Sequence, residues 1–154
     1  MRVIVTTDGS RQSLTAARTF KSFTDPDKID EVILLAVIRP FSSVAFADEI
    51  SGTKSKYSAQ ELSFREAADN ALASLAEEFA DWGPKVSKRV RSGSPANEII
   101  KAAASSEVGL IVVAAGGRGL SDSVLMGSTA QRVQHYAPCP VLVVRPQQRP
   151  KKKR

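Results

Sequence analysis

The sequence predicts a three-layer α/β fold, in which helices cover both faces of one parallel β-sheet. Short runs of β-branched and aliphatic residues alternate along the chain with segments whose apolar residues recur at helical spacing. Two of the runs, residues 31–38 and 108–115, are apolar almost without interruption, which is typical of strands that are buried on both faces. A chain that alternates strands and helices in this way pairs its strands in parallel, with the helices as crossovers.

The composition is that of one folded domain. Of the 154 residues, 42% are hydrophobic and 25% are charged, a balance that supports a core and argues against disorder. No apolar run approaches the roughly 20 residues that cross a bilayer, no secretory signal is visible, and the single cysteine excludes an internal disulfide. We therefore expect a cytoplasmic protein that does not interact with a membrane.

Positive charge is concentrated at the C-terminal end of the chain. The formal net charge is +6, and residues 151–154 contribute four positive charges. The basic run has no interleaved aromatic residues that could stack on bases, so the net charge alone does not indicate nucleic-acid binding. We expect a domain at residues 1–146, a disordered basic tail at 147–154, and no nucleic-acid partner.

The first strand, turn and helix occupy the N-terminal residues. The β-branched run Val3–Val5 predicts a strand, and Ser10 or Ser13 can cap the helix that follows. Asp8 then lies at the carboxyl end of the strand, where open α/β sheets bind their ligands. The alternative for Asp8 is a purely structural role in a tight turn.

The second unit combines a long strand with a long helix. Arg39-Pro40 ends the strand at 31–38, because the residue before a proline is held in an extended conformation. No periodicity persists through residues 41–57, which predicts a loop that either covers a ligand or forms an exposed excursion. The pattern is helical over residues 58–82, and Gly83-Pro84 stops it.

The third unit begins with a polar strand. Residues 86–91 alternate only roughly and carry three basic side chains, which suits an edge strand because charge discourages pairing with another sheet. Ser94 can cap the next helix and Pro95 can occupy its first position. Asn97 or Glu98 can then serve the free backbone donors of the first turn.

The segment from residue 108 to residue 144 carries the clearest functional signal. A buried-type strand leads into a glycine-rich loop, a helix opens on Gly127-Ser128-Thr129, and a second buried-type strand ends at Val144. Glycines let the backbone approach a phosphate, and a helix N-terminus attracts anions. The loop is neither a Walker A motif nor a dinucleotide fingerprint. The residues therefore indicate a phosphate or nucleotide site, with a ligand-free glycine turn as the alternative.

Catalytic and metal-binding patterns are not visible in the sequence. No nucleophile is arranged with a base, and no spacing of histidines and carboxylates suggests a metal site. Arg118 and Arg132 could pair with phosphate or could be solvated. We expect His135 to have a structural or surface role and Cys139, between two prolines, to be a packed rather than a reactive thiol.

Taken together, these segments resemble a single-domain universal stress protein over residues 1–146. The residues that carry the resemblance are Val3-Ile-Val-Thr-Thr-Asp8-Gly-Ser10, Val32-Ile-Leu-Leu-Ala-Val-Ile38, Gly93-Ser-Pro-Ala-Asn-Glu-Ile-Ile100, Gly116-Gly-Arg-Gly119, Gly127-Ser-Thr129 and Ala137-Pro-Cys-Pro-Val-Leu-Val-Val144. The resemblance implies a five-stranded parallel sheet in the order 3-2-1-4-5 and a homodimer formed through the last strand, Val141–Val144. An apolar edge strand normally requires a cover, so the residues themselves also allow such a dimer.

The resemblance also implies a ligand and its site. In ATP-binding members of the family, the nucleotide lies across the carboxyl ends of strands 1 and 4. Asp8 would then face the ribose and phosphates, Val37 would lie by the adenine, and the glycines and hydroxyls would cradle ribose and phosphates. The predicted site consists of Thr7, Asp8, Val37, Gly116, Gly119, Gly127, Ser128 and Thr129. The implied cofactor is ATP, with or without Mg²⁺.

The glycine-rich loop is two residues shorter than the ATP-binding pattern of the family, Gly-x2-Gly-x9-Gly-Ser/Thr. Only seven residues, Leu120 to Met126, separate Gly119 from Gly127. Two hypotheses therefore stay open. The first is a homodimeric, ATP-binding signalling module of the stress response, with at most slow hydrolysis, whose state an unidentified protein partner reads. The second is a module of the same fold that does not bind ATP and acts by dimerising or docking to other proteins.

Overall fold

The computed structural model describes residues 1–40, 59–116 and 126–147, with the side chains of residues 59–62 left out. The residues predicted to form the long loop after the second strand and the basic tail lie almost wholly outside these ranges. The elements in chain order are β1 (Arg2–Thr7), α1 (Arg11–Phe23), the short 3-10 helix η1 (Pro26–Lys28), β2 (Glu31–Ile38), α3 (Ala59–Glu77), β3 (Lys85–Ser92), α4 (Pro95–Ser105), β4 (Leu110–Ala114), α5 (Ser128–Tyr136) and β5 (Val141–Val144).

The strands form one five-stranded parallel sheet in the order β3-β2-β1-β4-β5. The central strand β1 places Val3 beside Val32 of β2 on one side and beside Leu110 of β4 on the other. This arrangement confirms the predicted fold class and strand order. It also confirms that the basic strand β3 lies at an edge, where its charged side chains do not have to be covered by a further strand.

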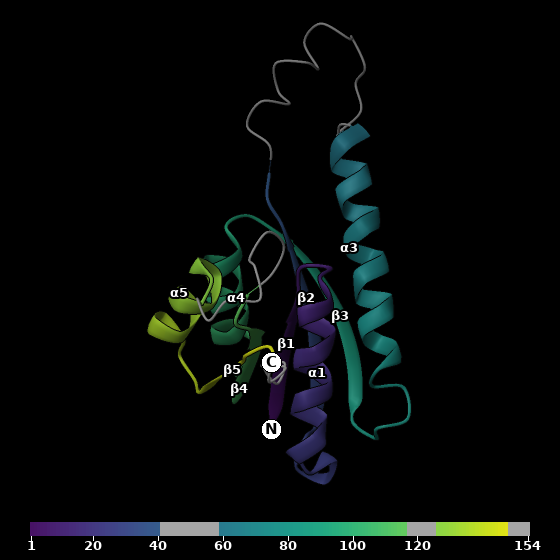
Figure 1. Ribbon diagram of the computed structural model, residues 1–154, viewed down its shortest axis with the longest axis vertical. Helices are drawn as coiled ribbons and strands as arrows, with labels where there is room; N and C mark the ends of the chain where they lie inside the picture. The colour runs from purple at the N-terminus through teal and green to yellow at the C-terminus, as the bar shows by residue number, and fades with distance from the viewer. Residues whose placement is uncertain (41–58, 117–125, 148–154) are drawn as a thin grey trace, which may run out of the picture.

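Helices cover both faces of the sheet, with α1 and α3 on one face and α4 and α5 on the other (Figure 1). The alternation of side chains along β1 separates the two layers. Val3 and Val5 pack with residues of α1 and α3, whereas Ile4 packs with residues of α4 and α5. All three side chains are fully buried. The middle of β1, Val3–Val5, is therefore apolar at every position because it has a core on both faces of the sheet.

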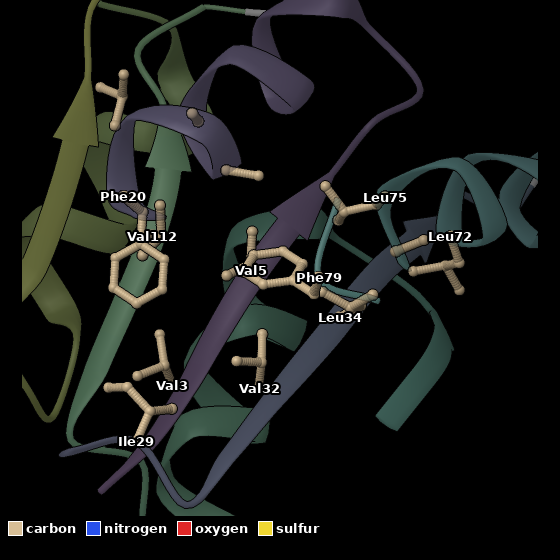
Figure 2. Close-up of a cluster of buried hydrophobic side chains, with 14 residues drawn as sticks. Val3, Val5, Phe20, Ile29, Val32, Leu34, Leu72, Leu75, Phe79 and Val112 are labelled. Atoms are coloured by element: carbon tan, nitrogen blue, oxygen red, sulfur yellow. The ribbon is translucent and has the colours of Figure 1, made fainter. Parts of the chain in front are cut away.

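Aliphatic side chains and the rings of Phe20 and Phe79 fill the layer between the sheet and the helices α1 and α3 (Figure 2). Phe20 of α1 and Phe79, just after α3, are both essentially inaccessible to solvent. The ring of Trp82 meets both of them edge-on, with centroid distances of 5.5 Å to Phe20 and 5.6 Å to Phe79. This cluster joins the two helices at the end of the sheet where the strands begin.

Helix α3 ends at Glu77, so the prediction that it continues to residue 82 is wrong. The next backbone N–H groups bond to carbonyls three residues back, as Phe79 N does to Ala76 O at 3.0 Å and Trp82 N to Phe79 O at 3.2 Å. These are the tighter turns of a 3-10 type of backbone. Gly83, with φ of +117°, then reverses the chain into β3.

The predicted helix starts agree with the structure. Ser10, rather than Ser13, is the N-cap of α1, and its Oγ accepts a hydrogen bond from Ser13 N. Ser94 is the N-cap of α4 and Pro95 its first residue. Among the described residues, none of the helices is long and apolar enough to cross a lipid bilayer.

Candidate functional site

A cavity of about 660 Å³ opens at the carboxyl ends of β1, β2 and β4. The helix that follows β1, α1, packs on one face of the sheet, whereas the helix that follows β4, α5, packs on the other face. Because β1 and β4 are neighbours in the sheet and lead to helices on opposite faces, a crevice is left between the ends of these two strands. The volume lies within the range of small-molecule sites in proteins.

The cavity brings together the described residues of the predicted site. Its wall includes Thr7, Asp8, Val37, Gly116, Gly127, Ser128 and Thr129. These residues come from four separate segments of the chain, the ends of β1, β2 and β4 and the start of α5. The remaining predicted residue, Gly119, and the neighbouring Arg118 lie outside the described residues.

The turn after β1 is held by the side chains of Thr7 and Ser13. The Thr7 hydroxyl oxygen accepts a hydrogen bond from Gly9 N at 3.1 Å, and the two hydroxyls lie 2.8 Å apart. Ser13 Oγ donates to the carbonyl of Ser10 at 2.7 Å, so the proton between the two hydroxyls comes from Thr7. Both side chains are buried. Thr7 thus shapes the turn that carries Asp8 into the cavity.

Asp8 lies on the exposed part of this turn. Its Oδ1 accepts a hydrogen bond from Ser10 N at 2.9 Å, which is an Asx-turn contact. The structural alternative considered from the sequence is therefore real, because Asp8 does stabilise a turn. The turn contact engages Oδ1, and the carboxylate also lines the cavity. The two roles are compatible in one side chain.

The start of α5 forms the opposite wall. Gly127 N donates to Ala115 O at 2.7 Å, and Ala115 N donates to Val144 O at 2.8 Å, which ties this wall to β4 and β5. Gly127 is the N-cap and supplies no side chain to the free N–H groups of the first turn, and that turn contains no acidic residue. The positive end of the helix dipole therefore faces the cavity beside the hydroxyls of Ser128 and Thr129.

A third wall was missed by the sequence analysis. Helix α3 lines the cavity with one aromatic and three small side chains, Phe64, Ala67, Ala68 and Ala71. Ala68 also packs against the core between α3 and the sheet. The alanines leave space where larger residues would fill the cavity, and this run of small residues was the available signal.

The described residues do not provide a ready metal site. Within residues 1–40, 59–116 and 126–147, no group of three histidine, cysteine or carboxylate side chains could hold an ion. His135 lies in the last turn of α5, and its ring meets that of Tyr136 edge-on at 4.7 Å. Burial raises the pKa of the Cys139 thiol, which favours the unreactive protonated form.

Comparison with known proteins identifies the family. The family model of the universal stress proteins matches residues 1–145. This chain belongs to the universal stress protein family. Universal stress protein MJ0531 of Methanocaldococcus jannaschii is 31% identical over 98% of this chain and 84% of its own length. MJ0577 of the same organism is 28% identical over 94% of each chain.

Solved structures of universal stress proteins share the fold. The structure of MJ0577 superposes with a TM-score of 0.79 at 28% identity, over 96% of this chain and 97% of that one. A universal stress protein in complex with cAMP superposes with a TM-score of 0.69 at 20% identity, over 94% and 96%. A family member from Arabidopsis thaliana with AMP bound gives 0.64 at 14% identity, over 96% and 92%. Some members of this fold therefore bind adenine nucleotides.

Proposed function

We propose that this universal stress protein binds ATP in the cavity between β1, β2 and β4 and acts as a nucleotide-responsive module rather than as a dedicated enzyme. The observation that carries the proposal is the convergence of seven predicted site residues on one cavity from four segments of the chain. The solved relatives with cAMP and AMP support an adenine nucleotide as the class of ligand.

The two sides of the cavity differ in chemistry, as a nucleotide requires. The end of β2 and the alanines of α3 offer an apolar slot beside Val37, which suits the adenine ring. Gly116, Gly127 and the first turn of α5 offer backbone approach and helix N–H groups, which suit phosphates. In this orientation Asp8 lies between the two sides, where its carboxylate would accept hydrogen bonds from ribose hydroxyls.

Calorimetry with ATP in the presence and absence of Mg²⁺ tests the proposal. Asp8→Asn keeps an oxygen for the Asx turn and removes the charge, and we expect it to weaken ATP binding by roughly tenfold. Thr129→Ala should weaken binding by a smaller factor. Asp81→Asn is the matched control, because Asp81 is exposed in the turn before β3, at the other end of the sheet. Absence of binding at millimolar ATP would refute the proposal.

A homodimer formed along β5 is part of the proposed function. β5 is an edge strand of the sheet, and Val141, Leu142 and Val143 are only partly buried within one chain. Pairing with a second copy would cover this apolar edge. Sedimentation should therefore give a dimer for the wild type and a monomer for Val143→Lys. Lys88→Glu on the opposite edge strand is the control and should remain dimeric.

The second candidate is a protein-docking module that does not bind ATP. The feature in its favour is the glycine-rich loop, in which seven residues stand where the ATP-binding pattern has nine. Nucleotide analysis of the purified protein by mass spectrometry discriminates between the two. Co-purified adenine nucleotide supports the first, and its absence together with a negative calorimetric titration supports the second.

A further inference from the structure

A second hollow adjoins the nucleotide cavity. It has a volume of about 420 Å³ and is lined by Arg39, Pro40, Gly93, Ser94, Pro95, Ala96, Ser128, Thr129 and Arg132. Four of these residues, Arg39, Pro95, Ser128 and Thr129, also line the larger cavity. The two hollows therefore meet at the start of α5, on the side where the phosphates of a bound nucleotide would lie. We call the second hollow the arginine pocket.

The wall of the arginine pocket carries two positive charges and no carboxylate. Among the described residues, neither Arg39 nor Arg132 forms a salt bridge, and Arg132 makes only a long contact of 3.4 Å from Nη2 to Asn97 Oδ1. Glu98 of the neighbouring helix α4 is engaged by Arg91 at 3.5 Å and by Lys101 at 3.4 Å. Two guanidinium groups with free donors favour a phosphoryl group.

Hydroxyl groups add neutral donors to the same wall. The side chains of Ser94, Ser128 and Thr129 line the pocket, and neither Ser94 nor Gly127 caps its helix with a side-chain hydrogen bond. Serine and threonine hydroxyls can each donate one hydrogen bond to a phosphate oxygen. Donors of both charged and neutral type thus surround one hollow.

The backbone holds the pocket open. Gly93 N donates to Ile38 O at 2.8 Å, which fixes the chain after β3 against the end of β2, immediately before Arg39. Gly93 has φ of +147°, and a Cβ at this position would lie 2.9 Å from Glu98 Cγ. A larger residue here would strain the backbone and would require the Glu98 side chain to shift, so glycine suits this wall. Pro40 keeps Arg39 extended, so the arginine leaves the sheet at the edge of the pocket.

We propose that the arginine pocket binds the terminal phosphoryl group of the nucleotide, so that Arg39 and Arg132 make the protein select nucleotides by the length of their phosphate chain. This inference rests on the proposed function, because it takes the nucleotide to lie with its phosphates at the start of α5. The inference gives the site a preference for nucleotides with a longer phosphate chain, which the fold alone does not provide. AMP would leave the pocket empty, whereas ATP would reach it.

The test is a calorimetric series of AMP, ADP and ATP with the wild type, Arg39→Gln and Arg132→Gln. We expect each substitution to weaken ATP binding on the order of tenfold and to change AMP binding by less than about twofold. Arg132→Lys keeps the charge without the planar fork and should give an intermediate loss. Lys28→Gln, in η1 near the start of β2, is the control for long-range charge effects and should leave the series unchanged.

Two results would overturn the inference. One is an equal loss of AMP and ATP affinity in the arginine variants, and the other is no loss at all. If no adenine nucleotide binds, the proposed function fails, and inorganic tripolyphosphate becomes the probe for the pocket alone. Tripolyphosphate binding that disappears in Arg39→Gln and Arg132→Gln would support an anion site there, and no binding of tripolyphosphate would refute it.

Discussion

The side-chain hydroxyls of Thr7 and Ser13 lie 2.8 Å apart and join the end of β1 to the first turn of α1. Both side chains are buried, and each also bonds to the backbone of the turn between them. The pair therefore fixes the turn that presents Asp8 to the cavity. Two buried hydroxyl groups therefore contribute directly to the shape of this corner.

Thr7→Val should destabilise the fold by about 1–2 kcal/mol, because it leaves buried hydrogen-bonding groups without their partner. Thr7→Ser keeps the hydroxyl and should restore most of the stability. Urea unfolding followed by fluorescence of Trp82, the single tryptophan, measures both variants. Equal stability of Thr7→Val and the wild type would mean that the hydroxyl pair does not hold the turn.

Gly83 and Gly93 form a matched pair for measuring backbone strain and steric contact separately. Both have positive φ, at +117° and +147°, but a Cβ on Gly83 meets nothing within 4 Å, whereas a Cβ on Gly93 lies 2.9 Å from Glu98 Cγ. We expect Gly83→Ala to cost about 1–2 kcal/mol for its backbone conformation, and Gly93→Ala to cost more. Thermal unfolding of the two variants compares them directly. A Gly93→Ala variant no less stable than Gly83→Ala would contradict the contact with Glu98.

Stability at acidic pH should depend on the ion pair between Arg18 of α1 and Glu78, just after α3. Arg18 Nη2 lies 2.6 Å from Glu78 Oε1, and its hydrogen bond holds the pKa of Glu78 below its ordinary value of 4.5. The unfolded chain therefore binds this proton at a higher pH than the folded chain does. The stabilisation is present above about pH 4.5 and is lost as the pH falls through the lowered pKa of the folded state.

Urea midpoints measured between pH 7 and pH 3 check this dependence. Arg18→Gln and Glu78→Gln should each flatten the loss of stability below about pH 4.5, and Glu77→Gln, which changes an exposed neighbour, should not. Some acid dependence should persist in every variant, because the N-terminal ammonium also lowers the pKa of Asp30. Unaltered profiles in both variants would show that the ion pair contributes nothing to folding.

Cys139 should react slowly with thiol reagents. Burial raises its pKa, so the nucleophilic thiolate is scarcer at neutral pH than in an unfolded peptide. We expect alkylation by iodoacetamide at pH 8 to be slower in the folded protein than in urea by at least severalfold. A folded-state rate equal to that in urea would identify Cys139 as an accessible thiol instead.

Local patterns predicted most of the elements but not where α3 ends. Leu75, Phe79 and Trp82 are spaced four and three residues apart, as on the face of a helix, and all three pack into one layer of the core. The backbone nevertheless leaves the α-helix after Glu77 through turns that close over three residues. The spacing of apolar residues cannot distinguish an α-helix from these tighter turns, because an apolar side chain reaches the same core from either type of backbone.

The convergence of the predicted residues on one cavity could be expected from the sequence, because it depends on where the strands end. Residues that follow parallel strands meet at one edge of the sheet, so Asp8, Val37 and Gly116 converge once the strands are recognised. The strand order itself was implied by the resemblance to the family, and the structure confirms it. The wall formed by α3 was not predicted, since residue spacing does not show which part of a helix extends past the sheet.

The sequence by itself determined the alternation of strands and helices, the apolar character of the inner strands and the glycines and hydroxyls at the cavity, because these follow from periodicity and backbone freedom over a few residues. Only the tertiary structure decided which distant side chains face each other. Arg39 follows β2 and Arg132 lies in α5, yet both line one pocket. That proximity results from the order of strands and the side on which each helix returns, which no local pattern encodes.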